Sequence, residues 1–421
     1  MNTWTRDAAR LKIDSFDTLS PDRQDALIAY CNEHFPPSVY ERHLACRKRA
    51  MDNVRRSKEV LLGVTQKFPP LLTRERVSGG IEDMRGVAIV LTAGGEGERL
   101  KKSLMERGAD EERLKDFTKA TYPLPGFYKD YGALQTNLRL IARLSDQLGF
   151  DIPVIVTTGP AGSITARVVP QLISSHNQFG LKRIKVLEQD ARLHLTMDDT
   201  MAYTLVDGSA VPITHPDETG GPLMKLKSGS VGGGVNLLTW LEQIGCSKML
   251  VLQATGLYDP TLLPAMASAL NQYDCIGAGI VRTAFDALDP FGTYVTVVNK
   301  TAEKVIIIEQ DIRNDTTRAL RDETGRFFLP YNTGLYAFKN ELLTENDLPD
   351  YATPPKEILP NLSRSPKIGY AATDIFSLAG SAAVLSIPAN SFAVIKNADD
   401  LALLTELGKR YGLDKICHED A

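Results

Sequence analysis

The chain of 421 residues is 43% hydrophobic and 24% charged, which is the composition of an ordinary globular protein with a substantial core. Its formal net charge of −4 at pH 7 gives no excess of basic residues for nucleic acid or an anionic membrane, so we expect neither as a partner. The five cysteines are scattered without a C-x-x-C pair, the start of the chain is polar, and no apolar run approaches the roughly 18 residues of a membrane helix. These features predict a cytoplasmic protein with reduced thiols.

The first part of the chain, residues 1–82, is predicted to be a helical extension. Ser20 and Pro21 are typical of a helix start, and a proline pair separates this helix from a second one at about 39–61. The second helix is rich in Lys and Arg. Its charge indicates either a polyanion-binding face or a solvated helix, and the acidic residues among the basic ones favour the solvated helix.

From residue 87 the pattern changes to short apolar runs that alternate with helical segments. Runs such as 152–157 and 184–188 have the length expected of strands that are buried on both faces of a sheet. The alternation predicts an α/β fold with a doubly wound, mostly parallel sheet. We place this catalytic domain at residues 83–390 and a closing segment with a final helix at residues 391–421.

A glycine-rich turn, LTAGGEGERL, follows the first of these apolar runs directly. Gly94, Gly95 and Gly97 lack a Cβ, so their backbone can adopt positive φ and its N–H groups can approach a phosphate closely. Arg99 offers a charge-assisted contact to the same anion, and Lys119 follows in an ordered, non-helical segment. The turn has neither the G-x-G-x-x-G spacing of a dinucleotide loop nor the G-K-[ST] ending of a P-loop. A glycine cradle with an arginine and a lysine suits a triphosphate.

This stretch resembles the signature of the sugar-nucleotide pyrophosphorylases of the UDP-glucose and UDP-N-acetylglucosamine type. In that family a strand leads into a Gly-Gly-x-Gly loop, and a lysine follows after a variable insert. The resemblance implies a Rossmann-like, GT-A-type nucleotidyltransferase sheet and extends, through four further segments, to the C-terminal helix. One departure is that Lys119 follows Thr118, where the family usually has a proline.

Two of the further segments concern the nucleotide base. The strand end at Gln189 is similar to a Phe-x-Gln element of the family, which implies that this amide hydrogen-bonds uracil through its donor and its acceptor. The segment KLKSGSVGGGVN is similar to a glycine-rich turn on which the base lies. The resemblance thus implies nucleotide binding by Ala93, Gly94, Gly95, Glu96, Gly97, Gln189, Gly232 and Gly233.

A third segment, MLVLQATGLYDP, resembles the strand that ends in the metal-binding aspartate of the family. Position by position, this aspartate falls on Thr255, and a neutral hydroxyl is a poor ligand for Mg²⁺. Three alternatives are open: Asp259 is the ligand from a shifted loop, Mg²⁺ is held mainly by substrate phosphates and a second carboxylate, or activity is lost. The best second carboxylate is Asp374, which aligns with an acidic residue in the C-terminal block of the family.

That block, ATDIFSLAGSAAVLSIPANSFAVIKNADDL, carries the strongest resemblance. It keeps a lysine, Lys396, which by this resemblance contacts the substrate phosphates. Asn332, Thr333 and Gly334 similarly look like the sugar-contacting segment of the family.

Together these resemblances imply a uridylyltransferase that forms a UDP-sugar and pyrophosphate from UTP and a sugar 1-phosphate, with Mg²⁺ as the cofactor. Glucose 1-phosphate and N-acetylglucosamine 1-phosphate are the first candidates for the sugar phosphate. The catalytic cations would be Arg99, Lys119 and Lys396. Two alternatives are open: a relative that uses an unusual sugar phosphate or another nucleotide, and a catalytically silent sugar-nucleotide-binding protein, for which Thr255 is the main argument.

Overall fold

The computed structural model describes residues 3–77, 79–231, 235–284, 291–299, 302–355, 357 and 364–416. Chain contacts divide the protein into two compact units. The small unit consists of Met1–Gly63, Asp190–Gly221 and Leu348–Ala372, and the large unit consists of Val64–Gln189, Pro222–Asp347 and Thr373–Ala421.

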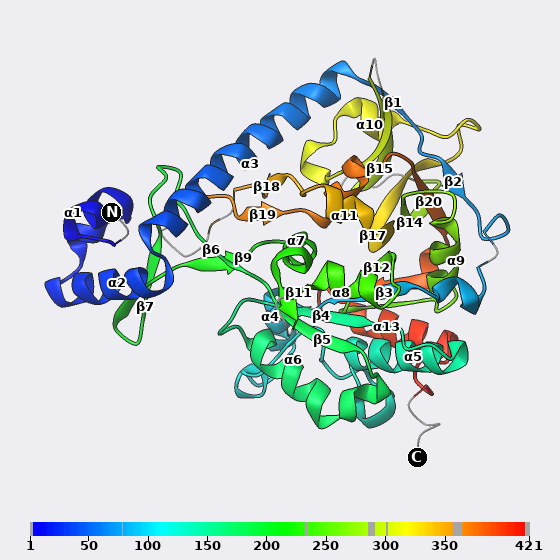
Figure 1. Ribbon diagram of the computed structural model, residues 1–421, viewed down its shortest axis with the longest axis horizontal. Coiled ribbons are helices and arrows are strands. Elements are labelled where there is room, and N and C mark those ends of the chain that lie inside the picture. Colours follow the sequence, from blue (N-terminus) through cyan, green and yellow to red (C-terminus); the bar gives the residue numbers. More distant parts are fainter. Residues whose placement is uncertain are drawn as a thin grey trace. The chain divides into compact units, whose positions relative to one another are not determined.

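The large unit is built on an 11-stranded sheet (Figure 1). Its main strands are, in spatial order, β2 (Leu71–Leu72), β20 (Ala382–Ile387), β14 (Cys275–Arg282), β17 (Phe328–Lys339), β12 (Lys248–Gln253), β3 (Val87–Thr92), β4 (Val154–Thr158) and β5 (Ile184–Glu188). A branch is attached through β15 and consists of β1 (Thr65–Lys67), β15 (Thr293–Val298) and β16 (Glu303–Ile308). Along the main order β17 is antiparallel to both neighbours and all other pairs are parallel. The predicted mostly parallel sheet is therefore confirmed.

The helices of the large unit differ in what they bury, and several of them contribute apolar residues to its main core. They are α4 (Glu98–Glu106), α5 (Ala133–Leu148), α6 (Ile164–Ser175), α7 (Gly221–Ser228), α8 (Leu237–Gln243), α9 (Leu262–Ala269), α10 (Asp315–Ala319), α11 (Glu341–Glu345), α12 (Ile375–Leu378) and α13 (Asp400–Arg410). In α5, Leu134, Leu138 and Ile141 are buried at a spacing of three to four residues, which gives the helix one apolar face toward the sheet core.

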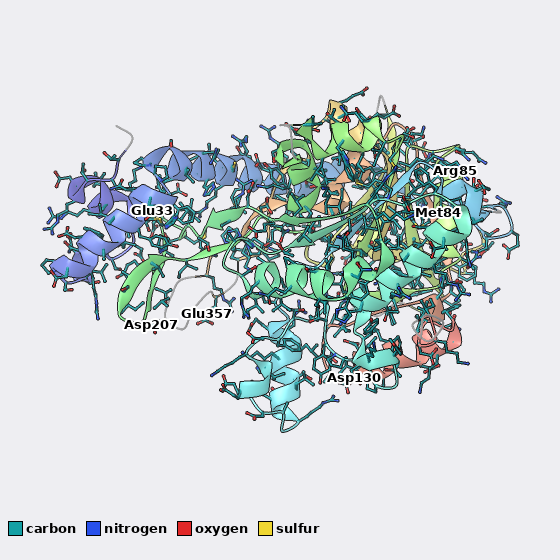
Figure 2. The ribbon with its side chains drawn as sticks, turned by 60° about the horizontal axis from the view of Figure 1, so that its bottom comes forward. Glu33, Met84, Arg85, Asp130, Asp207 and Glu357 are labelled. Atoms are coloured by element: carbon teal, nitrogen blue, oxygen red, sulfur yellow. The ribbon has the colours of Figure 1, made fainter. Side chains whose placement is uncertain are left out.

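The first strand of the site, β3, lies in the middle of this sheet. Its apolar residues are fully buried, as expected of a parallel strand with neighbours on both sides. The short 3₁₀ turn Ile81–Met84 leads into it, with the Met84 side chain buried in the core and Arg85 at the surface (Figure 2).

The chain changes direction across the sheet between β3 and β12. From β3 it proceeds through β4 and β5 on one side, and it then returns to place β12 on the other side of β3. Thr92 and Gln253, at the carboxyl ends of β3 and β12, lie opposite each other in the parallel register. Ligands of doubly wound sheets bind outside the carboxyl ends of strands at such a switch point, so the fold itself marks this edge as a binding site.

In its described residues the small unit combines three helices with three two-stranded sheets. The helices are α1 (Arg6–Lys12), α2 (Pro21–His34) and α3 (Pro37–Gly63), and the strand pairs are β6 (Ala191–Leu193) with β9 (Thr214–Pro216), β7 (Tyr203–Val206) with β8 (Ser209–Pro212), and β18 (Asp350–Ala352) with β19 (Ile368–Tyr370). The helix predicted to start at Pro21 is confirmed, and the helix predicted at 39–61 extends by two residues at each end. The prediction treated residues 1–82 as one extension, whereas contacts place β1 and β2 in the large unit, because strands belong where they pair.

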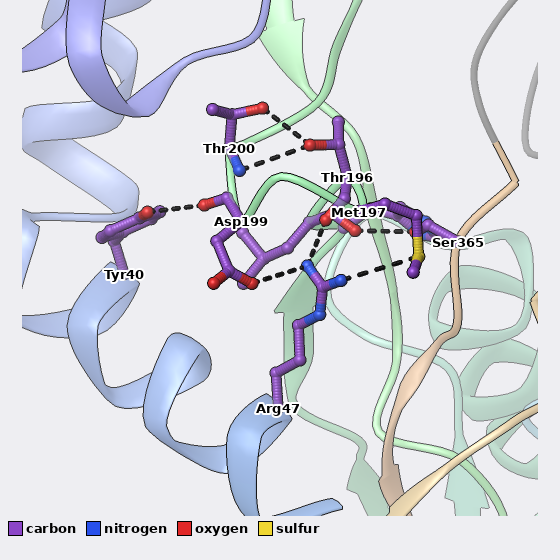
Figure 3. A network of polar contacts seen from close by, with 9 residues as sticks. Tyr40, Arg47, Thr196, Met197, Asp199, Thr200 and Ser365 are labelled. Atoms are coloured by element: carbon purple, nitrogen blue, oxygen red, sulfur yellow. Dashed lines mark hydrogen bonds and ion pairs between the residues drawn. The ribbon is translucent and has the colours of Figure 1, made fainter. Parts of the chain in front are cut away.

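A network of polar contacts anchors α3 within the small unit (Figure 3). The Arg47 guanidinium is buried, pairs with the Asp199 carboxylate at 3.1 Å and donates to the carbonyl of Thr196. The Tyr40 hydroxyl donates to the carbonyl of Asp199 at 2.6 Å. Arg47 of the basic helix thus holds a turn of the small unit.

Within the part of the chain that the structure describes, no helix is both long enough and apolar enough to span a membrane.

Candidate functional site

The glycine-rich turn connects β3 to α4 at the switch point. Gly97 precedes α4 with a φ of 81°, and a Cβ on it would lie 2.9 Å from both Lys119 Cβ and Phe117 Cε1. Backbone conformation and space therefore both require glycine at this position. Gly95 has no positive φ and no atom within 4 Å of its Cβ position. Of the three loop glycines, Gly97 uses the freedom to adopt positive φ, and Gly94 and Gly95 do not.

The loop also lies directly against Gln189, the residue predicted to contact the base. A Cβ on Gly94 would lie 2.4 Å from Gln189 Oε1, so glycine makes room for this amide. Of the other predicted loop residues, Ala93 is buried and donates its N–H to the carbonyl of Thr157 at 2.7 Å, and Glu96 is exposed. The structure thus brings the loop and Gln189 together, although about 90 residues separate them in the sequence.

Three cations that are distant in sequence converge at this edge of the sheet. The pKa of Lys119 is lowered to about 8, first by burial and then by the neighbouring charges of Arg99 and Lys396, while Asp400 opposes the shift. Arg99 lies in the first turn of α4, Lys119 in the segment after α4, and Lys396 in the turn before α13. Like charges that depress the pKa of a lysine are costly without an anion between them, so the arrangement is that of an anion site.

Two short strands hold Lys396 at this site. Strand β13 (Gly256–Tyr258) pairs with β21 (Phe392–Val394), and the pairing continues as Ile395 donates its N–H to the carbonyl of Thr255 at 2.9 Å. Lys396 therefore follows directly after the contact with Thr255, the position predicted for the metal-binding aspartate. The Lys396 Nζ atom lies 3.5 Å from the centroid of the Phe291 ring.

Asp259, the first alternative metal ligand, lies at the far end of β13 from Thr255. Its carboxylate pairs with Arg74 at 3.1 Å and accepts hydrogen bonds from the N–H and hydroxyl of Thr261. Those contacts occupy the oxygens that a metal ion would use. Among the residues outside the masked stretches, no group of three or more His, Cys, Asp and Glu side chains is placed to hold a metal ion.

The predicted sugar segment lies on β17. Asn332 accepts a hydrogen bond from the Tyr294 hydroxyl at 3.2 Å and donates to the Tyr336 hydroxyl at 2.6 Å. Thr333 is 1% exposed and donates its hydroxyl to the carbonyl of Ala278, so its side chain serves the sheet and does not face a ligand. The three residues of this segment therefore differ in what they can offer to a sugar.

A pair of carboxyl groups lies beside this segment. The pKa of Asp374 is raised to about 7, first by burial and then by the charge of Glu309. Burial first, and the charge of Glu309 after it, also raise the pKa of Tyr336, whose hydroxyl accepts a hydrogen bond from Asn332. The sequence analysis did not identify Glu309, although an acidic residue that directly follows an apolar strand run was a usable signal.

Gln253 is a second residue at the switch point that the sequence analysis did not identify. It ends β12 opposite Thr92, and a Cβ on Gly334 would lie 2.1 Å from Gln253 Nε2. Gly334 has a φ of 77°, so it is a glycine for both conformational and steric reasons. Gln253 thus lies between the glycine loop and the sugar segment. The predicted base platform at Gly232 and Gly233 lies outside the described residues.

The chemistry of this edge is that of a polyanion site with amides and hydroxyls on its flanks. The fold that carries it is a doubly wound, mostly parallel sheet. Comparison with solved structures makes this assignment more specific, because 82 chains match, and several of them are sugar-nucleotide pyrophosphorylases.

The UDP-N-acetylglucosamine pyrophosphorylase of Trypanosoma brucei, solved in complex with an inhibitor, matches 97% of this chain and 85% of its own, with a TM-score of 0.65 and 15% identity. The UDP-glucose phosphorylase of the same organism matches 80% of this chain and 70% of its own, with a TM-score of 0.58 and 14% identity. The UDP-glucose pyrophosphorylase of Leishmania major matches 77% and 66%, with a TM-score of 0.57 and 14% identity. The chain therefore has a UDP-sugar pyrophosphorylase-like fold, as its sequence motifs predicted.

No family model matches the sequence, and a sequence search of curated proteins finds no match. At identities this low the structural likeness establishes the fold, and the activity has to be argued from the site.

Proposed function

We propose that the chain transfers a uridylyl group from UTP to a sugar 1-phosphate and releases pyrophosphate. The observation that carries the proposal is the convergence of Arg99, Lys119 and Lys396 beside a glycine turn at the switch point of the sheet. The fold likeness to pyrophosphorylases of UDP-N-acetylglucosamine and UDP-glucose supports the same chemistry.

The reaction is an in-line displacement at the α-phosphorus of UTP. An oxygen of the sugar phosphate forms the new bond to this phosphorus, and the bond to the bridging oxygen breaks with its electron pair, which leaves on pyrophosphate. A sugar phosphate is already anionic at neutral pH, so no general base is needed. Catalysis then depends on alignment and charge neutralisation.

The position of each cation indicates which phosphate group it would contact. Arg99 and Lys119 adjoin the glycine loop and would hold the triphosphate and stabilise pyrophosphate as it leaves. Lys396 approaches from β21 and would neutralise the incoming sugar phosphate. The amide of Gln189, against Gly94, would read the pyrimidine edge through one donor and one acceptor.

The donor set of the site fits a magnesium ion that enters with the triphosphate. Mg²⁺ needs only one or two protein carboxylates when phosphates and water complete its shell, and Asp374 with Glu309 provides such a pair. When bound, the ion would neutralise charge on the phosphates. Asp259 does not fit this role, because Arg74 and Thr261 already occupy its oxygens.

One observation favours a second candidate, a sugar-nucleotide-binding protein without transfer activity. Thr255 occupies the position of the metal-binding aspartate and is 6% exposed, so this position offers no carboxylate. The binding surfaces would be the same in both cases, and only turnover separates them.

A pyrophosphate-release assay distinguishes the two candidates. The full chain is incubated with Mg²⁺, one of UTP, CTP, GTP and ATP, and either glucose 1-phosphate or N-acetylglucosamine 1-phosphate. We expect release with UTP that depends on the sugar phosphate. Background rates in every combination, together with calorimetric binding of a UDP-sugar, would contradict transfer and establish the silent binder.

A further inference from the structure

The turn that carries Lys396 is held by one side chain, that of Asp400. The Asp400 Oδ2 atom accepts the backbone N–H of Lys396 at 2.7 Å and that of Asn397 at 2.8 Å. Asp400 is the first residue of α13, and the side chain of the N-cap residue Asp399 makes no capping hydrogen bond to the described residues of the helix. The carboxylate therefore fixes the preceding turn, and its two bonds are of the strong, charge-assisted kind.

The same carboxylate faces the cation cluster. Among the neighbours that shift the pKa of Lys119, Arg99 and Lys396 lower it and Asp400 raises it. One carboxylate therefore balances part of the charge that the three cations gather, while it binds the backbone of one of them. An ordinary surface turn would not have one carboxylate that both binds its backbone N–H groups and interacts with a nearby cluster of cations.

The Lys396 ammonium group lies against the Phe291 ring and also borders a cavity, so the backbone turn contributes to where this group lies. Lys396 and Asp400 both line a cavity of about 270 Å³, with Phe291 and Arg410 among the other lining residues. A lysine that borders open space is not fixed by close packing on that side. Displacement of its charge by about 1 Å can greatly lower the rate of the chemical step.

Helix α4 fixes the turn from the other side. The N–H of Ala398 donates to the Ser103 hydroxyl at 3.3 Å. The nearby ion pair of Arg107 with Asp399 is exposed to solvent and adds little to this contact. Because α4 starts at the glycine loop, the loop and the Lys396 turn share one support.

We propose that Asp400 is a positioning residue that holds Lys396 for the phosphate step and limits the positive charge around Lys119. This proposal rests on the proposed transfer reaction. Asp400 touches no substrate in this role. It acts through the backbone of Lys396 and through its charge on Lys119.

Two variants of Asp400 separate its two contributions, and its neighbour provides the control. Asp400→Ala removes both backbone contacts and the charge, and we expect kcat to fall roughly tenfold or more. Asp400→Asn keeps an oxygen acceptor without the charge, and we expect a smaller fall of roughly threefold. Asp399→Asn removes an adjacent acid whose side chain is 78% exposed, and we expect kcat within about twofold of the unchanged protein.

A second readout distinguishes positioning from mere loss of folding. Inorganic pyrophosphate binding is measured by calorimetry at pH 6.5, which is below the Lys119 pKa of about 8. Asp400→Asn should bind pyrophosphate as tightly or more tightly, because the cluster becomes more positive, while kcat falls. A parallel loss of pyrophosphate affinity, kcat and Tm would overturn the proposal, as would full activity of Asp400→Ala.

The experiment also separates this proposal from the proposed function. If the unchanged protein releases no pyrophosphate, the transfer reaction is refuted. The effect of the Asp400 charge on Lys119 can then still be measured by itself. After ¹³C reductive methylation, the NMR titration of Lys119 should show a lower pKa in Asp400→Asn than in Asp399→Asn. Equal pKa values would refute the link.

Discussion

The carboxyl edge of the large sheet and the core of the small unit both gather titratable side chains, and they do so in opposite ways. At the sheet edge Lys119 remains partly exposed beside two other cations that repel it. In the small unit His43, His194 and His215 are 6%, 1% and 4% exposed, and burial is the first cause that lowers their pKa values to about 3, 4 and 3.

The histidines are held neutral by neutral partners. His43 Nδ1 accepts the N–H of Leu193 at 3.2 Å, and His215 Nδ1 donates to the carbonyl of Pro216 at 2.8 Å. The rings of His194 and His215 meet edge to face at 5.4 Å. The Nδ1 atoms of His43 and His215 are therefore satisfied without charge, whereas His194 Nδ1 has no hydrogen-bond partner among the described residues. The cations at the sheet edge still carry charge, which favours a ligand of opposite sign.

The largest effect is expected when one cation of the cluster is removed. Lys396→Ala should lower kcat by roughly 10²–10³-fold, because charge at the transferred phosphate matters more in the transition state than in the ground state. Tm should stay within a few degrees. The control is Lys182→Ala, since Lys182 is 77% exposed and its pair with Asp151 lies at the surface. Equal kcat for both variants would show that Lys396 has no part in the chemistry.

The second effect is the dependence of the free energy of unfolding on pH, which tests whether the buried histidines are neutral. Above pH 6.5 the histidines are neutral in the folded and unfolded chain. Below it the unfolded chain takes up protons that the folded small unit excludes, so the free energy of unfolding should fall by up to about 1.4 kcal/mol per pH unit for each histidine. This loss should continue down to the folded pKa values of about 3 to 4.

The measurement is urea unfolding at pH 7.5, 6.5 and 5.5, followed by the fluorescence of Trp4 in a Trp240→Phe background, because the chain has only 2 tryptophans. His194→Gln should weaken the pH dependence. His34→Gln should leave it unchanged, since the His34 side chain is 45% exposed. A free energy of unfolding that stays constant from pH 7.5 to 5.5 would contradict the assignment.

The third effect compares two glycines of one loop. Gly97→Ala should lower the free energy of unfolding by about 1–2 kcal/mol, because an L residue resists positive φ, and it should weaken UTP binding by displacing the Lys119 segment. Gly95→Ala should stay within about 0.5 kcal/mol, since its Cβ would enter open space. Urea unfolding and UTP calorimetry give both values. Equal losses in the two variants would show that the loop geometry differs from the one described.

The smallest effect concerns the protonation of Lys119. With a pKa of about 8, Lys119 loses its charge as pH rises through this value, so UTP affinity should fall a few-fold between pH 7 and pH 8.5. Lys119→Arg keeps its charge throughout and should remove this dependence. Calorimetry at the two pH values checks it, and an unchanged slope in Lys119→Arg would assign the dependence to another group.

Much of the large unit could be predicted because its signals are local. An apolar run, a glycine turn and a helix follow one another at β3 and α4, and helices commonly connect the strands of a buried parallel sheet. The parallel sheet followed from the repetition of this pattern. The division into units could not be predicted, because the small unit is assembled from three separate stretches. Its strand pairs are each formed within one stretch, but its helices α2 and α3 pack against strands of the other two stretches.

The sequence by itself determined which residue types are present for the chemistry: the loop glycines, the amide of Gln189 and the cations Arg99, Lys119 and Lys396. Only the tertiary structure decided which of them meet. In the structure, Gly97 rather than Gly95 is the constrained glycine, and the Asp259 carboxylate forms an ion pair with Arg74. Gln253 lies at the switch point, and Glu309 lies beside Asp374. The physical reason is that propensity and patterning act over a few residues, whereas the meeting of side chains depends on strand order and register, which long-range pairing fixes.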